Sequence, residues 1–217
     1  MHDNRMTTEI LTIDKGQCLT DVLPAIPANT IFDKTITGCG ATHSEIVNAA
    51  RHSIIIEPNI PVILGKKAEH PFLFAVYEGI TKEDVKAYLA GEHDGYRKII
   101  TTPEGFDKKV LPAMHELEIP VYKDYFLLFD ECEKAIQDVG YRGDIYLPVE
   151  DFFKFENKAM VSATPIVPSD PRFEENGFKI LKLVPTYDSR IELTLCTTNN
   201  TVAVMRKLLK RLENETV

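Results

Sequence analysis

Two adjacent carboxylates follow an apolar run of five residues, 125–129. The acids are Asp130 and Glu131, and the run before them is typical of a strand buried on both faces of a sheet. Ligands of open α/β sheets bind at the carboxyl ends of the strands, so acids placed there can hold Mg²⁺ and activate a water molecule. The alternative is that one of the two acids caps the next helix. The pair is therefore a candidate catalytic site, with Asp130 as the metal ligand.

A turn containing two glycines follows a second β-rich run, residues 31–36. The turn consists of six residues, Thr37-Gly38-Cys39-Gly40-Ala41-Thr42. Gly38 and Gly40 allow positive φ, which lets backbone N–H groups approach the oxygens of a phosphate. Thr42 lies where a phosphate-binding loop places the hydroxyl that ligates Mg²⁺. The turn is a candidate cofactor-binding loop, and the alternative is an ordinary strand-to-helix turn.

This turn departs from the usual phosphate-binding loop at two positions. Ala41 stands where that loop has a lysine, and Thr35 stands where it has a glycine. Loss of one charge-assisted contact costs about 1.5–3 kcal/mol in binding. We therefore expect weak nucleotide affinity and poor or absent ATPase activity. Lys34, directly before the turn, is the alternative source of positive charge.

Small hydroxyl residues follow two further apolar runs. Ser162, Ala163 and Thr164 end the run at 159–162, and the segment Thr101-Thr102-Pro103-Glu104-Gly105 ends the run at 98–102. Hydroxyls at a strand end can link neighbouring loops by hydrogen bonds. Taken singly, each segment is better explained as an ordinary turn that contains proline.

Short apolar runs alternate with amphipathic segments along the chain. The expected strands are 31–36, 53–56, 72–76, 98–102, 125–129, 159–162, 179–184 and 191–195, and the expected helices are 42–51, 81–89, 131–139 and 202–212. Strands that are apolar throughout and alternate with helices predict an α/β fold with a mostly parallel central sheet and helices on both faces.

The composition argues against a broad nucleic-acid-binding face, a zinc site and a membrane-spanning segment. The net charge is −8 and the pI is near 5.3, so any contact with nucleic acid must be local rather than made by a broad basic face. The four cysteines are scattered without a Cys-x-x-Cys pair, which argues against a zinc site. No apolar run approaches the ~20 residues that span a bilayer, and we expect a cytoplasmic protein without membrane contact.

The order of these segments resembles the first RecA-like domain of the superfamily-2 helicases and translocases, the DEAD/DEAH-like group. The glycine turn resembles motif I, Asp130-Glu131-Cys132-Glu133 resembles motif II, and Ser162-Ala163-Thr164 resembles motif III. Two looser matches are Ile55-Ile56-Glu57-Pro58-Asn59 with motif Ia and 101–105 with motif Ib.

The resemblance implies a RecA-like P-loop fold and a role for each segment. The residues at 37–42 would cradle the phosphates of ATP, with Mg²⁺ held by Thr42 and Asp130. Pro58, Asn59, Thr102 and Pro103 would contact single- or double-stranded nucleic acid, and residues 162–164 would couple nucleotide state to strand binding. Gln17 stands upstream, where some members of the family read adenine with a glutamine.

The resemblance also implies a domain organisation. Residues 1–29 would be an extension packed on the motor domain, 30–198 the RecA-like domain, and 199–217 a helix leading to a second RecA-like domain. We expect a motor domain from a longer nucleic-acid remodelling ATPase, weak or inactive alone. The alternatives are a non-catalytic binding module of the same fold and an unrelated small-molecule α/β enzyme.

Overall fold

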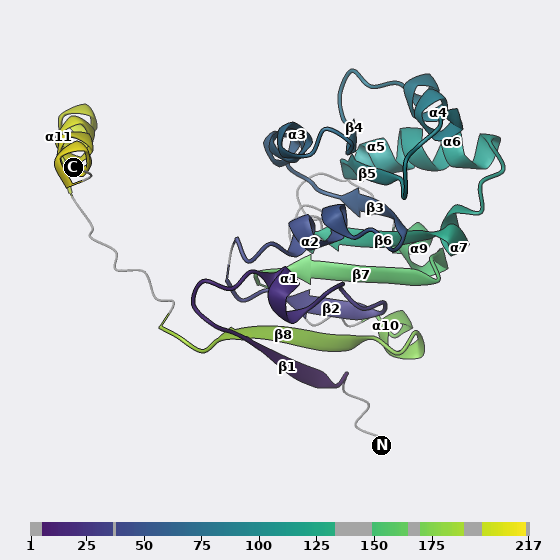
Figure 1. The fold of residues 1–217 in the computed structure, drawn as a ribbon, viewed down its shortest axis with the longest axis horizontal. Coiled ribbons are helices and arrows are strands. Elements are labelled where there is room, and N and C mark those ends of the chain that lie inside the picture. Colours follow the sequence, from purple (N-terminus) through teal and green to yellow (C-terminus); the bar gives the residue numbers. More distant parts are fainter. Residues whose placement is uncertain (1–5, 37, 133–148, 165–169, 189–196, 216–217) are drawn as a thin grey trace. The chain divides into compact units, whose positions relative to one another are not determined.

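The computed structural model describes residues 6–36, 38–132, 149–164, 170–188 and 197–215 (Figure 1). Contacts divide the chain into two compact units, Met1–Tyr187 and Asp188–Val217. The first unit contains a sheet with its covering helices, and the second contains helix α11 (Thr201–Glu215). Among the described residues, no helix combines the length and the apolar character needed to cross a membrane.

Eight strands of the first unit form a single sheet in which every pairing is parallel. Their order across the sheet is β1-β8-β2-β7-β6-β3-β5-β4 (Figure 1). The strands are β1 (Thr8–Ile13), β2 (Thr30–Asp33), β3 (His52–Ile56), β4 (Phe74–Val76), β5 (Lys98–Thr101), β6 (Tyr125–Asp130), β7 (Asn157–Ser162) and β8 (Lys179–Pro185). The predicted α/β class with a parallel central sheet is confirmed.

Helices connect the strands, as parallel pairing requires. In chain order they are α1 (Leu19–Val22), α2 (Ala41–Val47), α3 (Ile60–Glu69), α4 (Lys82–Ala90), α5 (Pro103–Gly105), the π-helix η1 (Phe106–Val110), α6 (Leu111–Glu116), α7 (Val121–Asp124), α9 (Val149–Lys154) and α10 (Arg172–Glu175). The predicted start of α4 is confirmed, because the Thr81 hydroxyl accepts a hydrogen bond from the Asp84 N–H and the Asp84 carboxylate accepts one from the Thr81 N–H.

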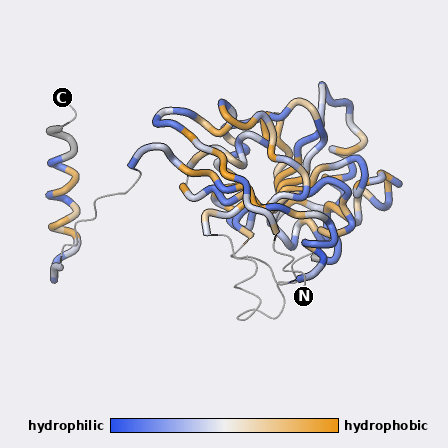
Figure 2. Tube along the Cα trace, turned by 90° about the horizontal axis from the view of Figure 1, so that it is seen from below, coloured by the Kyte–Doolittle hydropathy of each residue, from blue (hydrophilic) through white to orange (hydrophobic). Residues whose placement is uncertain are grey.

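The sheet is buried on both faces. Alternate residues of β6 belong to different hydrophobic clusters: Leu127 and Phe129 pack on one side, and Phe126 and Leu128 on the other. The first cluster includes residues of α4, η1, α6, α9 and α10, and the second includes residues of α1, α2 and α3. Figure 2 shows the hydrophobic strands gathered at the centre of this unit. Burial on both faces explains why the strands read as continuous apolar runs.

Several boundaries differ from those expected. Strand β2 ends at Asp33 rather than at residue 36, because the backbone turns at Thr35, where φ is 48°. Helix α2 ends at Val47 rather than at 51. The segment before residue 30 contributes β1 to the sheet, where it pairs with β8. The expected strand at 191–195 and most of the expected helix at 131–139 lie outside the described residues.

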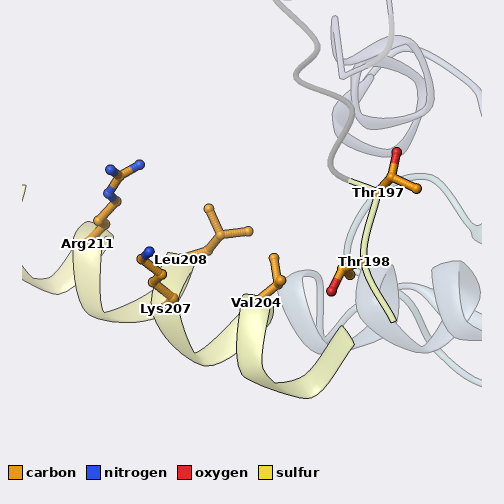
Figure 3. Close-up of a pocket in the computed structure, with 6 residues that line it drawn as sticks. All are labelled: Thr197, Thr198, Val204, Lys207, Leu208 and Arg211. Atoms are coloured by element: carbon orange, nitrogen blue, oxygen red, sulfur yellow. The ribbon is translucent and has the colours of Figure 1, made fainter. Parts of the chain in front are cut away.

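The second unit is described by itself. Helix α11 begins after Asn200, whose side chain accepts a hydrogen bond from the Ala203 N–H at 3.1 Å. Figure 2 shows hydrophobic and hydrophilic turns along the helix, in agreement with the amphipathic pattern read from the sequence. Figure 3 shows a hollow of this unit, which is lined by Thr197, Thr198, Val204, Lys207, Leu208 and Arg211.

Close packing of the segment after β5 makes Gly105 a position that cannot accept a side chain. A Cβ at Gly105 would lie 2.5 Å from Thr101 Oγ1 and 3.2 Å from the carbonyl oxygen of Val76. We expect Gly105→Ala to lower the free energy of unfolding by about 1–3 kcal/mol, the usual cost of overpacking. Urea unfolding followed by circular dichroism measures it.

Gly65→Ala provides the matched control for this prediction. Gly65 lies within α3 and has no atom within 4 Å of a Cβ placed there. Alanine favours a helix by up to about 1 kcal/mol relative to glycine, so this variant should be equally or more stable. Equal stability of Gly105→Ala and Gly65→Ala would contradict the packing described for Gly105.

Candidate functional site

The parallel register brings the carboxyl ends of β2, β7, β6 and β3 to one edge of the sheet. Lys34 follows β2 directly, and Asp130 is the last residue of β6. Strand β7 lies between these two strands, and its last residue, Ser162, accepts a hydrogen bond from the Lys34 N–H at 2.9 Å. The backbone of Lys34 is therefore anchored on the sheet at the level of the acid pair.

The ammonium group of Lys34 contacts both predicted acids. Lys34 Nζ lies 3.3 Å from Asp130 Oδ1 and 2.7 Å from Glu131 Oε1. Asp130 and Lys34 are buried, and Glu131 retains partial exposure. Burial alone would lower the pKa of Lys34, but the charges of Asp130 and Glu131 outweigh it and raise this pKa above its usual value. The lysine is thus held in its charged form.

The glycine turn also contacts the Asp130 carboxylate, through Thr42. The Thr42 hydroxyl donates a hydrogen bond to Asp130 Oδ2, the oxygen that Lys34 does not contact. Thr42 is the second residue of α2, and Gly40, which precedes the helix, has a φ of 90°. Gly38 also adopts positive φ, 75°. The turn has the backbone conformation predicted for its glycines, and it places Thr42 against Asp130.

Two non-glycine residues beside the ion pair have left-handed backbone conformations. Thr35 has a φ of 48° and Glu131 a φ of 50°. Such conformations are unfavourable for a side chain with a Cβ, above all for a β-branched one. The Thr35 hydroxyl and N–H both donate to Asp33 Oδ1, which stabilises this turn locally. Thr35 thus adopts a conformation that favours glycine, at the position where the usual loop has one.

A third carboxyl group, Glu57, lies at the same edge of the sheet, directly after β3. It is 1% exposed, and its Oε1 accepts hydrogen bonds from the Asn59 N–H at 2.8 Å and from Asn59 Nδ2 at 2.7 Å. Burial, followed by the negative charge of Asp130, raises the pKa of Glu57 to about 7. Glu57 therefore changes charge near neutral pH, next to the acid pair.

The oxygen atoms of Thr42, Asp130 and Glu131 suit a hard cation such as Mg²⁺. Within the described residues, no group of three or more His, Cys, Asp or Glu could hold a metal ion by itself. Mg²⁺ is commonly held by one or two carboxylates together with the phosphates of a substrate. The donors present therefore fit Mg²⁺ bound together with a phosphate ligand.

The glycine turn also contacts the segment that follows Gln17. Ala41 and Cys39 are buried, and the Cys39 carbonyl accepts a hydrogen bond from the Leu19 N–H at 3.0 Å. Gln17 itself is exposed, and its side-chain oxygen accepts a hydrogen bond from the Asp14 N–H at 2.8 Å, so its role in reading adenine stays a prediction. Thr37 lies outside the described residues.

The end of β7 has a different hydrogen-bond arrangement from the one expected of side-chain hydroxyls. The link from β7 to β2 is made by the main-chain oxygen of Ser162, while the Ser162 hydroxyl accepts from the Thr164 N–H at 2.9 Å. Thr164 is exposed, and Ala163 is partly exposed. Their coupling role stays a prediction.

The four residues predicted to contact nucleic acid differ in accessibility. Pro58 and Asn59 are partly exposed, but Thr102 and Pro103 are buried. The Thr102 hydroxyl accepts a hydrogen bond from the Gly105 N–H at 3.0 Å, and it thereby caps α5. Of these four residues, only Pro58 and Asn59 are accessible to a ligand. The contact with nucleic acid stays a prediction.

Sequence reasoning left Glu57 out of the candidate site and gave Lys34 only as an alternative cation. Each directly follows a buried strand, which is the same signal that identified Asp130. Glu57 directly follows the apolar run 53–56, so the signal is present there too, whereas the resemblance assigns roles to Pro58 and Asn59 only. Comparison of the chain with protein-family models and with curated proteins found no match.

The raised pKa of Glu57 predicts a specific dependence of stability on pH. The usual value is 4.5 and the value in the folded protein is about 7, so the folded state binds more protons between these pH values. Stability should therefore fall by up to ~3 kcal/mol as the pH rises from 4.5 to 7. Glu57→Gln should remove this component, because glutamine stays uncharged. Urea unfolding at pH 5 and pH 8 in EDTA measures it.

Glu104→Gln is the control, because Glu104 is an exposed acid on α5. Its unfolding free energies should follow those of the unmodified protein at both pH values. A difference between pH 5 and pH 8 that is the same for Glu57→Gln and Glu104→Gln would contradict the assignment.

Proposed function

We propose that this chain is a helicase- or translocase-type motor domain with a RecA-like fold, which binds ATP·Mg²⁺ at the carboxyl edge of its sheet and acts on nucleic acid. The observation that carries the proposal is the meeting of Thr42 and Asp130. They are 88 positions apart in the chain and joined by a hydrogen bond. The resemblance to the superfamily-2 helicases assigns both residues to one Mg²⁺ ion.

Further features of the same edge support the proposal. Gly38 and Gly40 adopt positive φ, so their backbone can come close to a phosphate group. Glu131 lies next to Asp130 with its side chain partly exposed, as a residue that activates water requires. The resemblance assigns the nucleotide to a site between two RecA-like domains, so we expect slow turnover by this domain alone and no unwinding.

One observation favours a second candidate, a non-catalytic binding module of the same fold. The acid pair already has a counter-ion within the chain, because Lys34 contacts both carboxylates. Asp130 and Glu131 therefore have a structural partner even without a metal ion. In this alternative the ion pairs of Lys34 with Asp130 and Glu131 stabilise the folded protein. The chain then binds nucleic acid or protein without hydrolysing nucleotide.

ATP hydrolysis in the presence of single-stranded DNA or RNA separates the two candidates. We expect stimulated turnover that falls to the uncatalysed level in Glu131→Gln, because removal of a general base typically costs 10²–10⁴-fold in rate. Glu131→Gln should still bind ATP·Mg²⁺. Asp130→Asn should lose binding as well, because it removes the carboxylate that Thr42 and Lys34 share. Phosphate release and isothermal titration measure these two effects.

Thr8→Ala, an exposed position on the edge strand β1, serves as the control and should leave turnover and binding unchanged. Absence of both ATP·Mg²⁺ binding and stimulated turnover would overturn the motor-domain proposal. Retained nucleic-acid binding under those conditions would support the non-catalytic module.

A further inference from the structure

We propose that Lys34 supplies the phosphate-binding ammonium group that Ala41 cannot, from the end of a strand instead of from the start of the following helix. This inference rests on the proposed nucleotide site and assigns a ligand contact within it. In the ligand-free chain Lys34 neutralises the acid pair, and with nucleotide bound its ammonium group contacts the phosphates.

The ammonium group of Lys34 lies at the carboxylate that would hold the metal ion. Lys34 Nζ lies 3.3 Å from Asp130 Oδ1, and the Thr42 hydroxyl donates to the other oxygen of the same carboxylate. The Lys34 ammonium group and the Thr42 hydroxyl therefore both contact the Asp130 carboxylate directly. A phosphate that shared a metal ion with Thr42 and Asp130 would therefore lie within reach of Lys34.

The position that usually carries the lysine is buried in the hydrophobic core of this chain. Ala41 is 4% exposed and packs within the hydrophobic cluster that includes Phe32, Ile46 and Leu128. A side chain at this position begins in the core and not at the edge of the sheet. The required positive charge must come from another residue, and among the described residues Lys34 is a lysine that contacts both acids.

The charges at this edge also favour a contact between Lys34 and a phosphate. Asp130 and Glu131 together carry two negative charges, and Lys34 carries one positive charge within 3.3 Å of both. Mg²⁺ bound to these carboxylates would neutralise them and repel the ammonium group. The triphosphate that arrives with the metal ion offers a new anionic partner at the same edge. Lys34 can therefore exchange its contact with the carboxylates for a contact with the phosphates while it stays in the site.

Isothermal titration of the whole chain with ATP·Mg²⁺, and separately with Mg²⁺ alone, tests this role. For Lys34→Gln we expect the affinity for ATP·Mg²⁺ to fall at least ten-fold, which corresponds to about 1.4 kcal/mol. The affinity for Mg²⁺ alone should stay equal or increase, because the acids lose their internal cation. Lys34→Arg, which keeps the charge, should recover part of the affinity for ATP·Mg²⁺.

Two further comparisons keep the test decisive. Lys179→Gln removes a lysine that pairs with Glu9 at 3.0 Å, at the other end of the sheet, and should bind like the unmodified protein. If Lys34→Gln does not fold, the double variant Lys34→Gln/Glu131→Gln is compared with Glu131→Gln alone. This comparison removes the lysine while one of the acids is already neutral, and the same ten-fold loss is expected.

The outcomes distinguish this inference from the proposed function. If the unmodified protein does not bind ATP·Mg²⁺, both are overturned. If it binds, and Lys34→Gln binds equally well or more tightly, Lys34 is only a counter-ion for the acids and this inference alone is overturned. A loss of ATP·Mg²⁺ binding without a loss of Mg²⁺ binding supports the role of Lys34.

Discussion

Parallel pairing of β2, β7, β6 and β3 is the constraint on which the rest of the site depends. Parallel strands in register end at the same edge, so residues that follow them meet even when they are far apart in the chain. Lys34 and Asp130 are 96 positions apart, yet they form a buried ion pair there. Because helices cover both faces of the sheet, the strands carry mostly apolar side chains along their length. Lys34, Glu57 and Asp130 lie where β2, β3 and β6 end, at this edge.

Much of this arrangement is predictable from sequence. Runs such as Ile54-Ile55-Ile56 identify buried strands, because neighbouring residues are apolar only when both faces are covered. The glycine turn and the acid pair were predicted from the residues that follow such runs. Strand β1 was missed because Thr8–Ile13 mixes polar and apolar residues and lies at the sheet edge, where most of its residues are exposed. Helix α3 was missed because Pro61 and Gly65 are typical of loops, although proline is well tolerated in the first turn of a helix.

The partners of the charged groups could not be read from the sequence. Propensity and periodicity give the element to which Lys34 belongs, but the ion pair depends on which strands are neighbours. The burial of Glu57 depends in the same way on the packing around the end of β3. The left-handed conformations of Thr35 and Glu131 run against the preferences of these residues, so no local rule predicts them. Departures of this kind commonly gather at functional sites.

The anchoring of Lys34 has a consequence for the speed at which the site can respond. Its N–H is bonded to Ser162 on β7, so its backbone is part of the sheet. Its ammonium group can therefore be redirected by rotation about side-chain bonds, without rearrangement of a loop. Rotamer changes of exposed side chains take picoseconds to nanoseconds, whereas loop motions extend to microseconds. The slow step in such a change is then the separation of a buried ion pair, and the barrier is set by electrostatics and not by the backbone.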